Sequence, residues 1–158
     1  MSALEAITPP ETRDRLRMLS FVLLGLALVV TGYLSYTKLT NTTMVCVESG
    51  VFNCDAVSSS IYAYFPRGTG IPVAVLGFST WIVMGAILIF ENRISFLRDY
   101  GSLLLLAISI FGFLFHCYLT YSSIVFIQAL CPWCLTAHTL MTIMMITQGI
   151  RVYKSFAT

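Results

Sequence analysis

The sequence predicts an all-α integral membrane protein, folded as a four-transmembrane-helix bundle with one large outer loop. Of its 158 residues, 58% are hydrophobic and only 10% are charged, whereas soluble domains carry roughly 25% charged residues. The charges are clustered, so that residues 18–37, 68–90 and 100–150 contain no Lys, Arg, Asp or Glu. This composition excludes a soluble globule, and a net charge of +2 offers no basic patch for nucleic acid.

The first two uncharged runs each have the length of one membrane helix, because about 20 apolar residues span the hydrocarbon core. We place these helices near 18–38 and 72–91. Residues 1–17 then form a cytoplasmic leader. A cleaved signal peptide fits less well, since the first run is longer than the roughly 7–15 residues of a signal core and no small-residue cleavage site follows.

The third uncharged run is too long for one helix and suits two helices joined by a short turn. Its most polar stretch is Tyr118–Ser123, so we place the helices near 101–122 and 130–150. Helices are expected here because a backbone in lipid must satisfy its own hydrogen bonds. The membrane domain would cover residues 18–152, and residues 153–158 would be a cytoplasmic tail.

The Lys and Arg residues are divided unevenly between the two sides of this bundle. Lys38 and Arg67 lie on the loop side. The other seven lie on the opposite side: Arg13, Arg15, Arg17, Arg93, Arg98, Arg151 and Lys154. Since positive charge collects on the cytoplasmic side, we predict a multi-pass protein of the inner (cytoplasmic) membrane with both termini in the cytoplasm. The outer loop would face the periplasm or the cell exterior.

The outer loop, residues 39–71, contains one helical pattern at 55–65. Val57, Ile61 and Phe65 are apolar and spaced by four, and Asp55 can cap the first turn. We expect a short amphipathic helix lying on the membrane surface over the mouth of the bundle. A surface loop without regular structure is the alternative, because the pattern is short.

Four of the five cysteines fall on the predicted outer side, where disulfides persist. Cys46 and Cys54 lie eight residues apart in the outer loop, and Cys131 and Cys134 form a C-x-x-C motif where the last helix begins. A C-x-x-C pair forms and opens a disulfide readily. The free N–H groups and dipole of a helix N-terminus stabilise a thiolate. This pattern is typical of a dithiol redox catalyst.

Zinc binding and static cross-linking are the alternatives to redox catalysis for these cysteines. A zinc site is disfavoured because the Cys46–Cys54 spacing exceeds the two to four intervening residues usual between zinc ligands, so we predict no metal. Two static disulfides would make the chain a non-catalytic membrane subunit. The loop closed by C-x-x-C is so short that a static bridge would stabilise it little.

At these four cysteines the sequence resembles the vitamin K epoxide reductase family, over about residues 18–152. The loop motif of the family is matched by Cys46-Val-Glu-Ser-Gly-Val-Phe-Asn-Cys54, which is followed by Ser60 and Tyr62. The bacterial branch is matched by Gly70-Ile-Pro72 and Gly77. The resemblance implies a four-helix bundle and a membrane thiol–disulfide oxidoreductase that supports disulfide bond formation.

The resemblance also implies a role for each cysteine. Cys46 would take electrons from a reduced, secreted thioredoxin-like partner, and Cys54 would pass them to Cys131. Cys134 would face the quinone (ubiquinone or menaquinone) and form a charge-transfer or covalent adduct with it. Because the sequence ends at Thr158 without a thioredoxin-like domain, we expect the thioredoxin-fold partner to be a separate protein on the outer face. Reduction of vitamin K epoxide or quinone is the alternative activity.

Quinone contacts are expected from Val57, Ser60, Tyr62 and His138. Ser60 resembles a family serine near the redox centre. His138 stands where vertebrate members carry a tyrosine, four residues after Cys134 and on the same helix face. An imidazole there could give a hydrogen bond or a proton to a quinone oxygen. A neutral histidine bonded to a neighbouring helix is the equal alternative.

Overall fold

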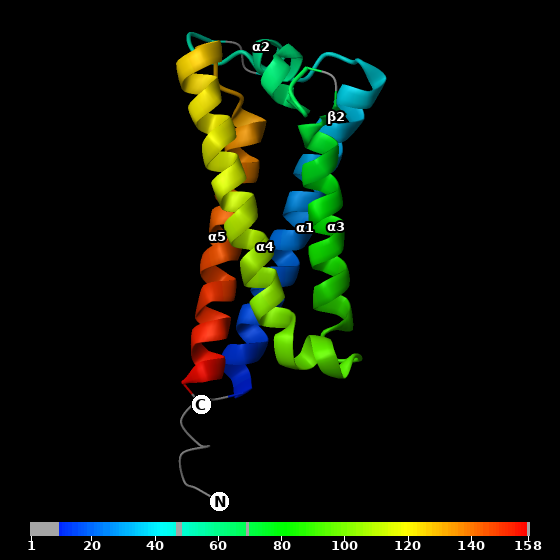
Figure 1. The fold of residues 1–158 in the computed structure, drawn as a ribbon, viewed down its shortest axis with the longest axis vertical. Coiled ribbons are helices and arrows are strands. Elements are labelled where there is room, and N and C mark those ends of the chain that lie inside the picture. Colours follow the sequence, from blue (N-terminus) through cyan, green and yellow to red (C-terminus); the bar gives the residue numbers. More distant parts are fainter. Residues whose placement is uncertain (1–9, 47–48, 69, 158) are drawn as a thin grey trace, which may run out of the picture.

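The computed structural model describes residues 10–46, 49–68 and 70–157. Four long helices run along the molecule: α1 (Pro10–Thr40), α3 (Val73–Phe90), α4 (Ser95–Ser122) and α5 (Pro132–Phe156) (Figure 1). Residues 1–9 of the predicted leader, residues 47–48 of the loop motif and Thr158 lie outside the described residues. Helices α1, α4 and α5 extend beyond the uncharged runs because a helix can continue past the lipid, whereas α3 lies within 68–90. Helix α1 begins at Pro10, a favoured position for proline because an N–H group in the first turn would have no acceptor within the helix.

Three helical segments of the described chain are long and apolar enough to cross a membrane: 14–40, 73–90 and 95–127. The prediction of a helical membrane protein is therefore confirmed. Helix α5 is not among the three candidates. It carries His138, Gln148 and four threonines, which lower its hydropathy. The fourth transmembrane span therefore stays a prediction.

The polar groups of α5 near its C-terminal end are bonded inside the bundle. Arg151 donates through Nη2 to Glu91 Oε1 at 2.6 Å and through Nη1 to Gln148 Oε1 at 2.9 Å. Gln148 in turn donates to Ser20 Oγ at 3.0 Å. All four side chains are buried. This network joins α5 to α1 and to the end of α3.

The apolar core lies in the same half of the bundle, where all four long helices contribute. Trp81, Met84, Leu88, Leu105 and Met144 are fully buried. Buried hydroxyls of α1 donate to backbone carbonyls one turn earlier: Thr31 to Ala27 and Ser35 to Thr31. Such bonds satisfy a hydroxyl without a partner from another helix.

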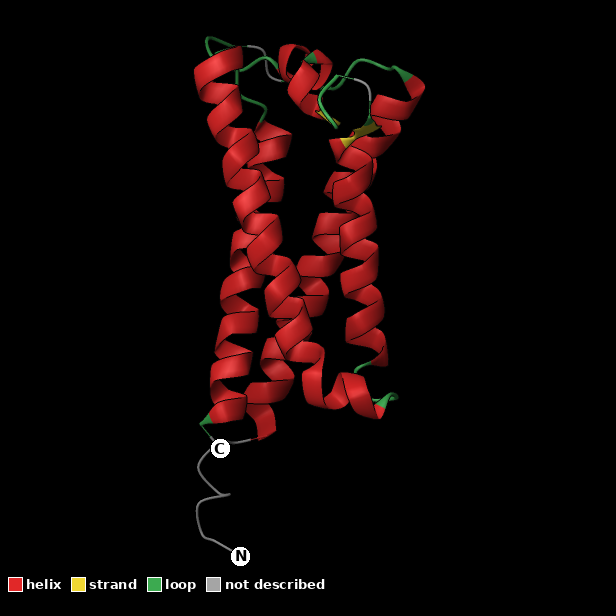
Figure 2. Cartoon of the chain, viewed as in Figure 1, coloured by secondary structure: helices red, strands yellow, loops and turns green. Residues whose placement is uncertain are grey.

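The loop between α1 and α3 folds differently from the single helix predicted at 55–65. Helix α2 (Cys54–Ser59) is followed by a 3-10 turn (Ile61–Ala63) and the antiparallel strands β1 (Tyr64–Phe65) and β2 (Ile71–Pro72) (Figure 2). The cap predicted at Asp55 is wrong. Asn53 caps α2 instead, because its Oδ1 accepts from the N–H of Ala56 at 2.9 Å.

Glycine is required between the two short strands. A Cβ at Gly70 would lie 1.9 Å from the carbonyl oxygen of Phe65. Lys38 of α1 donates to the carbonyl of Ser58 and lies over the Tyr64 ring at 4.7 Å, which fixes the loop to the bundle. Figure 1 shows this loop at one end of the bundle, with the beginning of α1 and the C-terminus at the other.

Candidate active site

Cys46 and Cys54 are joined by a disulfide. Cys54, the first residue of α2, is only 1% exposed, whereas Cys46 is half-buried. Cys131 and Cys134 are free thiols, and Cys131 is 2% exposed. One cysteine of each pair is therefore deeply buried. We call the end of the bundle that carries these four residues the cysteine end.

Backbone hydrogen bonds hold the two cysteine pairs together. The N–H of Leu130 donates to the carbonyl of Val51 at 2.9 Å, and the N–H of Asn53 donates to the carbonyl of Leu130 at 3.1 Å. Asn53 directly precedes Cys54, and Leu130 directly precedes Cys131. This pairing brings a buried cysteine from the loop beside a buried cysteine from the start of α5.

Cys131 lies just before α5, whose first residue is Pro132. The N–H of Cys134 donates to Cys131 Sγ at 3.4 Å. A side-chain hydrogen bond from Cys134 lowers the pKa of Cys131 to about 7, against the opposing effect of burial and with help from the backbone N–H groups of Cys134 and Trp133. A large share of Cys131 is consequently thiolate near neutral pH, and the thiolate is the reactive form.

A cavity of about 130 Å³ opens beside both free thiols of the C-x-x-C motif. One water molecule needs only about 10–15 Å³ by this measure, so the space can admit a larger molecule. The walls are mostly apolar. Three of the predicted quinone contacts, Val57, Ser60 and Tyr62, line it. Whether they bind quinone stays a prediction.

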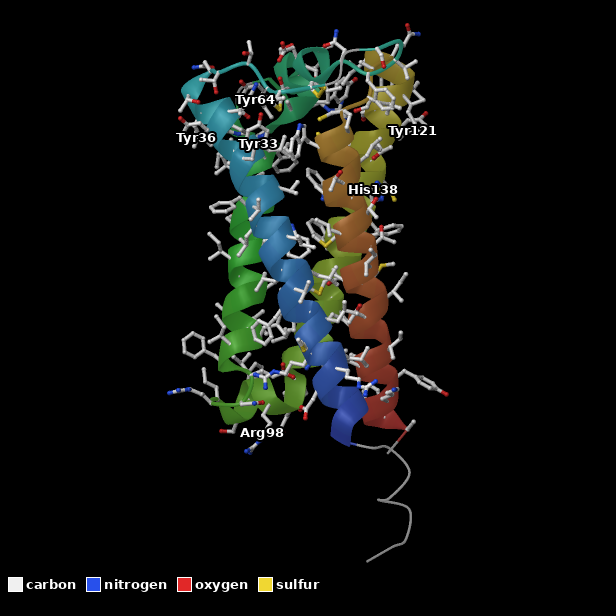
Figure 3. All side chains as sticks on the ribbon, turned by 180° about the vertical axis from the view of Figure 1, so that it is seen from behind. Tyr33, Tyr36, Tyr64, Arg98, Tyr121 and His138 are labelled. Atoms are coloured by element: carbon white, nitrogen blue, oxygen red, sulfur yellow. A yellow bond between two sulfur atoms is a disulfide. The ribbon has the colours of Figure 1, made fainter. Side chains whose placement is uncertain are left out.

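His138, the fourth predicted contact, is not among the cavity-lining residues (Figure 3 shows its position on α5). Its Nδ1 lies 3.2 Å from Thr120 Oγ1, and its Nε2 lies 3.8 Å from the sulfur of Cys117. His138 is thus bonded to α4, which corresponds to the alternative of a histidine held by a neighbouring helix. Its role in quinone binding is still a prediction.

Sequence reasoning missed His116. This residue lines the cavity from α4, and its ring stacks on that of His138 at 5.5 Å between centroids and 15° between planes. Thr120 and Ser123 line the same cavity. The spacing of 116, 120 and 123 places them on one helix face. This polar stripe in an apolar helix is the signal that could have identified His116.

The family model described as "Vitamin K epoxide reductase family" matches residues 18–148. The chain belongs to the vitamin K epoxide reductase family. It is therefore a membrane oxidoreductase of disulfide-related redox chemistry, and the family generally acts on quinone-type substrates. The resemblance at the four cysteines predicted this membership, and the family match confirms it.

In this family member, two aromatic residues hold the segment next to Cys46. Trp133 Nε1 donates to the carbonyl of Val45 at 2.9 Å, and the N–H of Val45 donates to the Tyr33 hydroxyl at 2.9 Å. The two rings also pack together, 4.8 Å between centroids. Trp133 stands inside the C-x-x-C motif, so one motif positions both cysteine pairs. Nothing in the sequence pattern pointed to Tyr33.

Proposed function

We propose that this protein oxidises the dithiol of a secreted, thioredoxin-like partner and passes the electrons to a membrane quinone, ubiquinone or menaquinone, and so supports disulfide bond formation. The observation that carries the proposal is the backbone pairing of Leu130 with Val51 and Asn53. This pairing sets the residue before Cys54 against the residue before Cys131, and Cys131 lines a mostly apolar cavity.

Electrons would enter at Cys46, because it is the more exposed member of the loop disulfide. A partner thiolate attacks the Cys46 sulfur, forming a mixed disulfide and releasing the thiolate of Cys54. The second thiol of the partner then attacks its own sulfur in that mixed disulfide. This exchange leaves an oxidised partner and a reduced Cys46–Cys54 pair.

The second exchange would move the electrons inward. The Cys54 thiolate attacks Cys131 of an oxidised C-x-x-C pair, and Cys134 leaves as a thiolate. Cys46 then attacks Cys54, and Cys131 leaves. The lowered pKa of Cys131 favours this step, because a thiol of lower pKa is a better leaving group. The product, a loop disulfide with two free C-x-x-C thiols, is the state of this structure.

The final step would oxidise the Cys131–Cys134 dithiol to a disulfide. It releases two electrons and two protons, which are what a quinone takes up to become a quinol. The chemical character of the cavity suits a quinone ring, since its walls are mostly apolar with a few polar groups such as Ser60, Tyr62 and His116. Cys134 is proposed as the thiol that reacts with the ring.

We further propose that α5 crosses the membrane as the fourth span of an inner-membrane protein, with the cysteine end outside and both termini in the cytoplasm. The buried hydrogen bonds of α5 support this position, because Gln148 and Arg151 are bonded inside the bundle rather than exposed to lipid. Arg98, which is exposed, lies at the end of the bundle away from the outer loop (Figure 3), as a cytoplasmic end requires.

Purified protein, a reduced thioredoxin and ubiquinone-1 or a short-chain menaquinone provide the test. We expect thiol-dependent quinone reduction by the wild type and by Cys117→Ser, the matched control for a cysteine outside both pairs, which keeps a hydrogen-bonding group beside His138. Cys134→Ala should abolish turnover. Cys46→Ala should lose turnover with the protein substrate but keep some with a small dithiol.

Wild-type protein that reduces none of these quinones would refute the proposal and favour a non-catalytic subunit with structural disulfides. Vitamin K epoxide belongs in the same assay as a further acceptor. If it alone is reduced, the alternative reductase activity replaces the one proposed.

A further inference from the structure

The two histidines beside the cavity differ in how their ring nitrogens are occupied. Both nitrogens of His138 have partners, Thr120 Oγ1 and the sulfur of Cys117. His116 lines the cavity, and among the described residues neither of its ring nitrogens has a hydrogen-bond partner. A donor and an acceptor on His116 are therefore available to a molecule in the cavity.

Other polar groups in the cavity wall are already engaged. The Ser60 hydroxyl donates to the carbonyl of Val57 at 2.8 Å, the Thr31 hydroxyl to Ala27 at 2.6 Å, and the Lys38 ammonium to a loop carbonyl. The hydroxyls of Tyr62 and Ser123 remain, and each is a single O–H group. Among the side chains that line the cavity, His116 offers both a ring N–H donor and a ring nitrogen acceptor, so it can pass a proton from one ring nitrogen to the other.

The ring of His138 fixes the plane of His116. The two imidazoles are stacked, and Phe113 packs against His138 at 5.5 Å between ring centroids. With both nitrogens bonded, its ring stacked on that of His116 and the tilted ring of Phe113 packed against it, His138 has little freedom to turn. It provides a rigid support for the ring of His116, which lines the cavity.

Resting on the function proposed above, we infer that His116, and not His138, gives the hydrogen bond and the proton to the quinone carbonyl oxygen. His138 is its positioning residue. The protons balance as follows: oxidation of Cys131 and Cys134 to a disulfide frees two protons, and quinol formation takes up two. The two electrons pass from the thiols to the quinone. His116 gives the proton of one ring nitrogen to one quinone oxygen while its other ring nitrogen takes up a proton from the thiols; the second thiol proton goes to solvent, from which the other quinone oxygen takes one.

Matched substitutions at the two histidines test this assignment. His116→Phe keeps a planar ring and removes both nitrogens, whereas His116→Gln keeps a donor that cannot titrate. His138→Phe makes the same change at the positioning residue. Two readouts are needed: kcat and KM for ubiquinone-1 reduction, and the infrared carbonyl stretch of ¹³C-labelled ubiquinone-1 bound to oxidised protein, which reports the hydrogen bond without turnover.

We expect His116→Phe to lower kcat about a hundredfold, the lower range for loss of a general acid, and to return the carbonyl stretch toward that of free quinone. His116→Gln should retain the shifted stretch but not the rate. His138→Phe should lower kcat less than tenfold and keep the shift.

The assignment is overturned if His116→Phe keeps the wild-type rate and the shifted stretch, or if His138→Phe alone loses both. Should His116→Phe fail to fold, His116→Gln carries the test, because a wild-type kcat in that variant excludes proton transfer by His116. A wild type that binds quinone with the shifted stretch but never reduces it defeats the proposed function, while the infrared readout still decides which histidine makes the contact.

Discussion

Gly70 offers a sharp test of how the loop wall of the cavity is held. In Gly70→Ala, the new Cβ would lie 1.9 Å from the carbonyl oxygen of Phe65 and 2.4 Å from the nitrogen of Pro66. Cβ atoms in proteins essentially never come closer than 3.0 Å to such atoms. The backbone between β1 and β2 must therefore separate by about 1 Å, the difference between 3.0 and 1.9 Å.

The loss of stability in Gly70→Ala depends on which atoms must move to make room for the new Cβ. Added methyl groups in well-packed regions usually cost about 1–3 kcal/mol. Here the obstacle is backbone rather than the tip of a flexible side chain. We therefore expect the upper end, a loss of about 3 kcal/mol in the free energy of unfolding. The pairing of Phe65 with Ile71 should loosen first, since Phe65 carries the obstructing carbonyl and Ile71 follows Gly70 directly.

Gly25→Ala is the matched control, because it makes the same chemical change in the interior of α1. No atom lies within 4 Å of a Cβ at Gly25. Alanine there should stabilise the helix by about 0.5–1 kcal/mol. Reversible unfolding in mixed detergent micelles measures both variants against the wild type. Equal stability of the two variants, or a Gly70→Ala protein as stable as the wild type, would show that the close approach does not hold the loop.

Three further predictions concern stability and thiol reactivity. Glu91→Gln should cost about 3–5 kcal/mol in the same unfolding assay, because it leaves the Arg151 guanidinium buried without a carboxylate, and adding Arg151→Gln should recover part of the loss. Alkylation of Cys131, followed by peptide mass spectrometry, should speed up as pH rises, with a midpoint at about 7, and level off at higher pH, where the thiolate dominates. In Cys134→Ala the midpoint should move to higher pH, since the main hydrogen bond to Cys131 is gone. Asn53→Ala should cost about 1 kcal/mol of unfolding free energy through loss of the α2 cap, and an unchanged stability would contradict that role.

The membrane character and the chemistry of the cysteines could be predicted from the sequence because both are properties of short segments. An apolar, uncharged run of about 20 residues favours the hydrocarbon core of a membrane whatever segments lie next to it. The C-x-x-C motif at residues 131–134 needs only a helix start to favour a thiolate, and α5 begins inside that motif. Boundaries were less accurate, since charge patterns mark the lipid edge and not the last helical hydrogen bond.

The loop shows where local patterns mislead. Apolar spacing at 55–65 predicted one helix capped by Asp55, but Asn53 and the strand pair around Gly70 divide the segment instead. The choice of cap depends on which side chain reaches a free N–H, and here it differs by two residues, Asn53 in place of Asp55. The strand pair depends on a contact between backbones that no periodicity reports.

The sequence by itself determined that the chain enters a membrane, that its redox chemistry lies in two cysteine pairs, and that it belongs to the vitamin K epoxide reductase family. Only the tertiary structure decided which residues meet. The pairing of Val51 with Leu130 and the stacking of His116 on His138 join segments far apart in the chain. Such contacts arise from the packing of whole helices and loops. His138, one helical turn from Cys134, therefore bonds to α4, whereas His116, which belongs to α4, lines the cavity.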